Sequence, residues 1–187
     1  MLEALFREER IELPSYPFPL VSIPSGSMLH FDLIRDVDLS KSPPEFRLKS
    51  GEILFVSAEQ KRELEDFAAK FGIPRVQRYD VWADLLLPFL DTQLPAADQE
   101  KALRRLQDQG FSLNEISSIR DLVKKPVLLY NSVVWEWVHL GLYDVLEAVR
   151  KNASPQGFQE FYWYAMCIAN RTDVLLDADQ SRERLGC

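Results

Sequence analysis

Residues 57–72 have the sequence SAEQKRELEDFAAKFG, and they mark the point where the hydrophobic pattern of the chain changes from strand-like to helical. Ser57 and Gln60 have the spacing of a capping box, which begins a helix by satisfying its first backbone N–H groups. Gly72 is a typical C-terminal stop, because glycine accepts the left-handed conformation that ends many helices. The stretch therefore predicts a helix that follows a strand-containing segment and begins a helical one.

The segment before this helix, residues 1–57, carries patterns of both helix and strand. MLEALFREERI at its start predicts a short amphipathic helix, and three prolines between positions 14 and 19 then predict an extended path. Residues 28–37, MLHFDLIRDV, alternate apolar and polar positions, and RLKSGEILFVS at 47–57 ends in an apolar run. We expect these two stretches to be strands of a small antiparallel sheet.

Helical patterns occupy residues 58–171. After the first helix they continue in YDVWADLLLPFLD (79–91), PAADQEKALRRLQDQG (95–110), SLNEISSIRDLVKK (112–125), VLLYNSVVWEWVHLGLYDVLEAVRKN (127–152, started by Pro126) and FQEFYWYAMCIANR (158–171, preceded by Ser154-Pro155). Residues 172–187 form a polar tail. The sequence thus predicts an α+β fold in a single domain, 1–187, with a small N-terminal antiparallel sheet followed by a mainly helical bundle of about six helices.

The charge of the chain restricts its partners. It has 187 residues and a formal net charge of −7, with 22 basic and 29 acidic side chains. Binding to nucleic acid or to an anionic membrane depends on clustered Lys and Arg, so this balance disfavours both. It suits a protein that docks onto a basic protein partner. A hydrophobic fraction of 47% is ample for a folded core.

The cysteines and the N-terminus indicate a cytoplasmic protein. Cys167 lies in an apolar helical stretch and Cys187 is the last residue, so we expect one buried thiol and one terminal thiol rather than a disulfide framework. The first ten residues do not resemble a secretory signal, and no apolar run is long enough to span a bilayer.

Residues 23–29, IPSGSML, contain a candidate nucleophile. With RLKSGEILFV farther along, this stretch resembles the serine and strand boxes of type I signal peptidases. The resemblance implies that Ser27 attacks a carbonyl with a neutral lysine as its base. The surroundings depart from that family, since Met28 is followed by LHF rather than a proline and the next lysine, Lys61, belongs to the helix above. The alternative interpretation is a turn at Ser25–Ser27.

Residues 103–123, LRRLQDQGFSLNEISSIRDLV, resemble a helix–turn–helix stretch of MerR-type regulators. That resemblance implies a DNA-binding regulator, with Arg104, Arg105 and Arg120 available for phosphates. Acidic residues are interspersed among these arginines, and the DNA-reading region of that family has no counterpart here. A plain corner between two helices, turned at Gly110, explains the same pattern.

His139 is the second catalytic candidate. On a continuous helix Trp135 and Tyr143 lie one turn to either side of it, and Glu136 lies three residues before it. A carboxylate and aromatic walls can tune an imidazole for acid–base chemistry or pH sensing. A histidine packed and hydrogen-bonded within the core is the alternative. Trp135, His139 and Tyr143 are also the candidate binding residues.

The chain also contains two closely spaced pairs of carboxylates. Asp80 with Asp84, and Asp36 with Asp38, are interpreted as solvated faces rather than as catalytic pairs. No further His or Cys stands at ligand spacing near His139, so we predict neither a metal site nor a cofactor.

The leading hypothesis is a soluble, cytosolic, non-catalytic protein-binding module, in a concrete form an inhibitor or immunity protein. It rests on the acidic charge and on the long helix and FQEFYWYAMCIA, which are apolar around most of their circumference. The same helices allow self-association. The alternatives are a hydrolase-like enzyme that uses Ser27 or His139 with Glu136, and a DNA-binding regulator built on 103–123.

Overall fold

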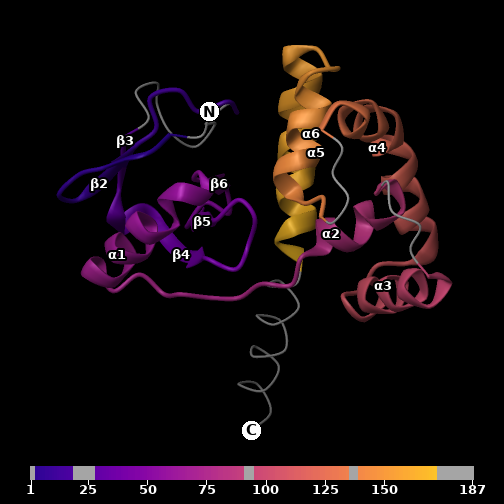
Figure 1. The fold of residues 1–187 in the computed structure, drawn as a ribbon, viewed down its shortest axis with the longest axis horizontal. Coiled ribbons are helices and arrows are strands. Elements are labelled where there is room, and N and C mark those ends of the chain that lie inside the picture. Colours follow the sequence, from indigo (N-terminus) through magenta and orange to yellow (C-terminus); the bar gives the residue numbers. More distant parts are fainter. Residues whose placement is uncertain (1–2, 19–27, 91–94, 135–138, 172–187) are drawn as a thin grey trace, which may run out of the picture. The chain divides into compact units, whose positions relative to one another are not determined.

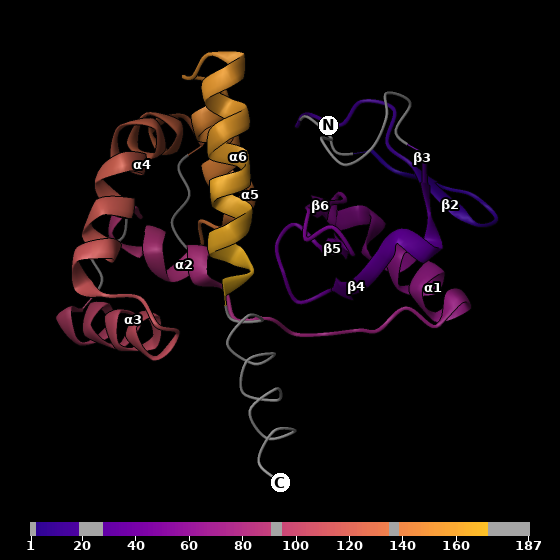
Figure 2. The same ribbon diagram turned by 180° about the vertical axis from the view of Figure 1, so that it is seen from behind.

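The computed structural model describes residues 3–18, 28–90, 95–134 and 139–171. The chain divides into two compact units, Met1–Arg78 (unit 1) and Tyr79–Cys187 (unit 2). The described part of unit 1 holds two three-stranded antiparallel sheets and one α-helix, and that of unit 2 holds five α-helices (Figures 1 and 2). The predicted α+β fold is therefore confirmed. The units divide after Arg78, so the first helix belongs with the strands.

The first sheet is formed by three short strands from the first thirty residues. Its strands are β1 (Leu5–Phe6), β2 (Arg10–Glu12) and β3 (Met28–His30), which lie in that order and pair antiparallel. The helix predicted for residues 1–11 is wrong, because Leu5 pairs with Glu12 and Phe6 with Ile11 across a hairpin. Isolated helices of this length are marginal in water, and pairing lets Ile11 become fully buried.

The second sheet contains β4 (Ile34–Asp38), β5 (Glu45–Leu48) and β6 (Ile53–Phe55), again antiparallel in that order. Both strands expected in this region are interrupted. The stretch 28–37 is divided by a 3-10 turn, η1 (Phe31–Leu33), which sends β3 and β4 into different sheets.

The stretch 47–57 is likewise a hairpin rather than one strand. Leu48 N–H donates to the Glu52 carbonyl at 2.8 Å, and Gly51 adopts φ +90° at the reversal. A positive φ is readily accessible to glycine, so Gly51 allows this tight turn.

The helix predicted from SAEQKRELEDFAAKFG is present as α1 (Lys61–Phe71), preceded by η2 (Ala58–Gln60). Its C-terminal stop is confirmed, since Gly72 is left-handed with φ +64°. The capping box is wrong. The Gln60 side chain instead accepts from Ala4 N–H at 2.9 Å and donates to the Ala4 carbonyl at 2.6 Å. It thereby ties β1 to the start of α1.

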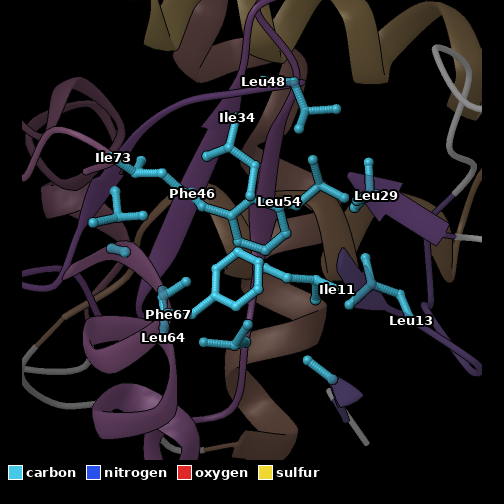
Figure 3. Packing of buried hydrophobic residues seen from close by; sticks show 14 of the residues in the cluster. Ile11, Leu13, Leu29, Ile34, Phe46, Leu48, Leu54, Leu64, Phe67 and Ile73 are labelled. Carbon is cyan, nitrogen blue, oxygen red and sulfur yellow. The ribbon is translucent and has the colours of Figure 1, made fainter. Parts of the chain in front are cut away.

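The core of unit 1 lies between α1 and the two sheets. Figure 3 shows side chains from both sheets and from α1 directed into one interior. Ile11 and Leu29 come from the first sheet, Phe46 and Leu54 from the second, and Leu64 from α1, and all five are fully buried. Short sheets depend for their stability on a packed hydrophobic face, and α1 completes that packing here.

Unit 2 consists of five α-helices and a short 3-10 turn. They are α2 (Val81–Leu86), η3 (Leu87–Phe89), α3 (Ala96–Asp108), α4 (Leu113–Val134), α5 (Leu142–Arg150) and α6 (Pro155–Ala169). In both views α5 and α6 run side by side, and α3 lies at the beginning of α4 (Figures 1 and 2). The Trp82 indole N–H donates to the Ala165 carbonyl at 3.1 Å, which joins α2 to α6.

Two sequence predictions about these helices are corrected. Pro126 does not start a helix; it lies inside α4, and the expected helix 127–152 is divided between α4 and α5. Val123 and Val127 on either side of the proline are completely buried, and this packing offsets the cost of the proline. Cys167 is exposed on α6 rather than buried. Among the described helices, none is long and apolar enough to cross a membrane.

Candidate functional site

Three of the sequence-predicted site residues, Ser27, Trp135 and Glu136, lie outside the described residues. His139 and Tyr143 are described, and both belong to unit 2. The helical spacing assumed for them is wrong, because His139 precedes α5 and Gly141 is the residue that caps it. Tyr143 lies in the first turn of α5.

The carboxylate of Asp80, the residue that precedes α2, lies beside His139. The His139 Nε2 atom is 3.8 Å from Asp80 Oδ2, and the two side chains are 37% and 27% exposed. The other Asp80 oxygen accepts from Ala83 N–H at 3.0 Å and so caps α2. Gly141 leaves room for the ring, since a Cβ there would come within 3.0 Å of Nε2. The tertiary structure thus forms a half-exposed His–Asp pair.

The carboxylate of Asp144 and the phenols of Tyr130 and Tyr143 lie at the start of α5. Asp144 accepts from Gly141 N–H at 2.8 Å and from the Tyr130 hydroxyl at 3.2 Å. Burial raises the pKa of Tyr143 to about 12, and burial with the nearby Asp144 also raises the pKa of Tyr130. Both phenols are therefore neutral near pH 7 and can serve as hydrogen-bond donors, not as bases.

The predicted corner between two helices is present at residues 109–112. Gly110 has φ +80°, Phe111 is buried, and Ser112 Oγ accepts from Glu115 N–H at 3.2 Å at the start of α4. Arg171 then pairs with Glu115 at 2.5 Å and stacks over the Phe111 ring at 3.9 Å.

The arginines of this corner have internal partners. Arg105 donates to both oxygens of Asp84, at 2.7 and 2.6 Å. Arg120 donates to the backbone carbonyls of Asp84 and Leu85, each at 3.0 Å. Arg104 is exposed and pairs with Glu100 at 2.8 Å. Two of the three arginines that the regulator hypothesis requires for phosphates are thus used to hold α2, α3 and α4 together.

The interpretation of Asp84, Asp36 and Asp38 as solvated carboxylates is wrong. Asp84 is only 6% exposed, and the Tyr79 hydroxyl also donates to it. Asp36 and Asp38 are 3% and 0% exposed. Sequence patterns missed these sites because their arginine partners come from distant parts of the chain.

The network around Asp36 holds unit 1 together. Arg47 Nη2 donates to Asp36 at 2.6 Å, and Arg78 bridges Asp36 and Glu45, the latter at 2.6 Å. Arg78 N–H also donates to Asp38 at 2.7 Å. Burial lowers the pKa of Arg47, and its hydrogen bond to Asp36 opposes that shift. These buried ion pairs are structural, because the guanidinium groups of Arg47 and Arg78 are already bound to carboxylates.

α4 has an exposed apolar face. Leu122, Leu128 and Leu129 are 56%, 45% and 50% exposed. Leu122 and Leu129 are seven residues apart, about two helical turns, so they share a face with Lys125 between them. Between Leu122 and Ser132, only Val123, Val127 and Asn131 are buried. We call Leu122, Lys125, Leu128 and Leu129 the α4 face.

A pocket of about 280 Å³ adjoins the α4 face. It is lined by Lys125 and Pro126 of α4, by Val149 near the end of α5, and by Asn152 and Ala153 after it. Because proline has no N–H, the carbonyl of Leu122 receives no helical bond from position 126. The pocket thus combines apolar walls with the polar side chains of Lys125 and Asn152.

A second open pocket lies in unit 1, on the hairpin of the first sheet. Its volume is about 400 Å³ and its lining is charged: Arg7, Glu8, Glu9, Arg10 and His30. His30 Nδ1 is 2.7 Å from Asp32 and Nε2 is 3.5 Å from Glu9. The hydrogen bond to Asp32, helped by Glu9, raises the pKa of His30.

Comparisons of the chain with protein-family models, with curated proteins and with solved structures find no match. Within the described ranges, no group of three or more His, Cys, Asp or Glu side chains is placed to hold a metal ion. The features of the described residues that bear on function are the α4 face, the adjoining pocket and the His139–Asp80 pair.

Proposed function

We propose that this chain is a non-catalytic protein-binding module and that the α4 face is its docking surface. The observation that carries the proposal is the exposure of three leucines on one half of a helix whose other half is buried. Single exposed leucines are common on soluble proteins, whereas several gathered on one face are typical of a protein interface.

The energetics favour binding at this face. Full burial of one leucine side chain contributes roughly 1.5–3 kcal/mol relative to leaving it in water. Leu122, Leu128 and Leu129 together therefore offer a partner several kilocalories per mole before the costs of association. Their backbone is held rigidly, since Val123 and Val127 anchor α4 in the core of unit 2.

The ion networks support the same conclusion. Asp84, Arg105 and Arg120 join α2, α3 and α4 within unit 2, and Asp36, Arg47 and Arg78 join the strands of unit 1. Charged groups of this kind rigidify a scaffold rather than perform chemistry. In its most specific form the proposal is a cytosolic inhibitor-type or immunity-type protein that binds another protein.

A capture experiment with matched variants tests the proposal. Wild-type protein, the double variant Leu122→Asp/Leu129→Asp and the control Leu113→Asp are used as bait in source-cell lysate. Leu113 has the same 56% exposure as Leu122 but is nine residues away, about two and a half turns, and so lies on the opposite side of α4.

The expected result is a stoichiometric protein partner recovered with the wild type and the control but lost with the double variant. Circular dichroism must show all three proteins equally folded. Recovery of the same partner by all three, or of none by any, would reject the α4 face as the docking surface.

The second candidate is an enzyme that uses His139 for proton transfer. The 3.8 Å approach of Asp80 to its Nε2 favours it, since a carboxylate orients and stabilises an imidazolium. A panel of hydrolase substrates with wild type, His139→Ala and His139→Gln tests it. Turnover that disappears in both variants while their circular dichroism is unchanged would place the enzyme first.

A further inference from the structure

The chemistry around the α4 face specifies the kind of partner that fits it. We infer that the partner contributes an acidic amphipathic helix, which packs on the α4 face and inserts one apolar side chain into the adjoining pocket. This inference rests on the proposed function. It adds the charge, the secondary structure and the anchoring contact of the partner element.

The pocket is suited to one anchoring side chain. Its volume of about 280 Å³ is at the lower limit of pockets that hold drug-sized ligands, which are about 300–1,000 Å³. Pro126, Val149 and Ala153 supply apolar walls, while Lys125 and Asn152 stand at the edge. An apolar residue fits such a hollow, and Leu122 and Leu129 extend the contact by one turn on either side.

A helix is the partner element that matches this spacing. Leu122 and Leu129 lie about two turns apart, with the Lys125–Pro126 edge of the pocket between them. A partner helix presents apolar residues at intervals of three and four positions, so its apolar face meets both leucines and the pocket together.

The charges around the face select acidic flanks. Lys124 and Lys125 are exposed on α4, and Lys151 lies at the end of α5, over the Tyr130 ring at 4.9 Å. Three carboxylates lie among these cations. Asp121 is exposed one turn before Lys125, and Asp144 accepts from the Tyr130 hydroxyl at 3.2 Å. Glu147 already pairs with Arg150 at 3.0 Å and with Lys151, so Arg150 is a fourth cation. The local balance is therefore basic on a chain whose net charge is −7. Carboxylates on a partner are therefore attracted to this face, and cations on a partner are repelled.

A second copy of the chain fits the face poorly. The midpoint between Leu122 and Leu129 is the Lys125–Pro126 pair. A two-fold axis through that point, which would pair the leucines of two copies, brings Lys125 against its own copy. Like charges in direct opposition are destabilising, and on this side of α4 the carboxylate nearest to Lys125 is the single Asp121, one turn away. The face is thus better suited to a different protein than to self-association.

Two synthetic peptides of about three helical heptads test the inference. They share one leucine stripe, and their flanking positions are all glutamate in the first and all lysine in the second. Fluorescence anisotropy measures the binding of each to the full-length protein at low and at high salt. The matched variants are Lys124→Glu/Lys125→Glu, Leu122→Asp/Leu129→Asp and, as a control, Lys101→Glu on the exposed side of α3.

We expect the acidic peptide to bind the wild type at least tenfold more tightly than the basic peptide, and salt to reduce this difference. Lys124→Glu/Lys125→Glu should reverse the preference, whereas Lys101→Glu should leave it unchanged. Leu122→Asp/Leu129→Asp should abolish binding of both peptides.

The possible failures are distinguishable. If both peptides bind equally, or the basic one binds better, and the leucine variant still abolishes binding, the acidic partner is wrong and the docking face stands. If binding is unaffected by the leucine variant, the peptides do not use the α4 face, and both the inference and the proposed function lose their basis. Absence of binding by either peptide overturns the inference.

Discussion

The guanidinium of Arg105 on α3 holds both carboxylate oxygens of Asp84 on α2, with N–O distances of 2.7 and 2.6 Å. The two residues are 21 positions apart, and this bidentate contact joins two helices that carry the start of α4. Hydrogen bonding to Asp84 raises the pKa of Arg105, which keeps the guanidinium charged throughout the accessible pH range. The contact is a structural connection within unit 2.

Replacement of Asp84 by alanine should destabilise unit 2 by about 2–3 kcal/mol, because it removes charge-assisted hydrogen bonds from a buried position. The four tryptophans of the chain all lie in unit 2, so denaturant unfolding followed by tryptophan fluorescence reports on this unit. Asp98→Ala, which removes an exposed pair with Lys101, should change stability by less than about 1 kcal/mol. Equal effects of the two substitutions would contradict the structural role of Asp84.

Replacement of Asp36 by alanine should destabilise unit 1 by about 3–5 kcal/mol, since it leaves Arg47 buried without its carboxylate. Hydrogen exchange with mass spectrometry of β4, β5 and β6 measures the effect locally. Glu65→Ala, which removes an exposed pair with Arg75, is the matched control. Exchange rates that stay at wild-type values in Asp36→Ala would refute the buried network.

Replacement of Pro126 by alanine should stabilise unit 2 by about 1–2 kcal/mol, because the new N–H restores the helical bond to the Leu122 carbonyl. The gain is smaller than the full helix penalty of proline, since alanine also loosens the unfolded chain. Pro155 stands at the start of α6, where no helical bond is lost, so Pro155→Ala should bring no such gain. A loss of stability in Pro126→Ala, measured by tryptophan fluorescence, would argue against an uninterrupted α4.

Asp80 should tolerate asparagine but not alanine. Asparagine retains the side-chain oxygen that caps α2, whereas alanine removes it at a cost of about 1 kcal/mol. The denaturant midpoint of unit 2 for Asp80→Asn should therefore stay close to that of the wild type, and that of Asp80→Ala should fall. A similar fall in both variants would show that the charge facing His139, rather than the cap, supplies the stability.

The stability of unit 1 should depend on pH through His30. The folded-state pKa of His30 is raised above 6.5, its ordinary value, so its protonated form is favoured by folding. This contribution is fully present below pH 6.5 and is lost as pH rises through the folded pKa. Asp32→Asn should lower the pKa of His30 in an NMR titration, and its destabilising effect should be larger at pH 5.5 than at pH 8.5.

The control for this prediction is Asp66→Asn, an exposed carboxylate on α1. It should leave the His30 titration unchanged. A His30 titration that is the same in the wild type and in Asp32→Asn would show that the 2.7 Å contact is not formed in solution.

Local signals in the chain were sufficient to predict some features. Gly72 ends α1 and Gly110 turns the chain between α3 and α4, because each is a glycine at a positive φ that other residues rarely adopt. Ser112 caps α4 through its own hydroxyl, a contact made within three residues. These features need no distant partner.

Features that depend on a distant partner were predicted wrongly. Gln60 was predicted to be a capping residue, yet both the oxygen and the nitrogen of its side-chain amide hydrogen-bond to the backbone of Ala4, 56 positions away. The start of the chain has a helical pattern, but β1 pairs with β2 and β2 pairs with β3, so Leu5–Phe6 and Arg10–Glu12 are strands instead. Asp80, from a distant part of the chain, lies beside His139, a contact that no sequence pattern indicated.

The sequence by itself determined the order of strands before helices, the acidic charge and the positions of the glycine turns, because these follow from composition and from interactions between near neighbours. Only the tertiary structure decided which apolar and charged residues are buried. Leu122 and Val123 are adjacent and both apolar, yet one is 56% exposed and the other is completely buried. Burial depends on which face of α4 packs against α5 and the rest of unit 2, and that packing leaves the α4 face exposed.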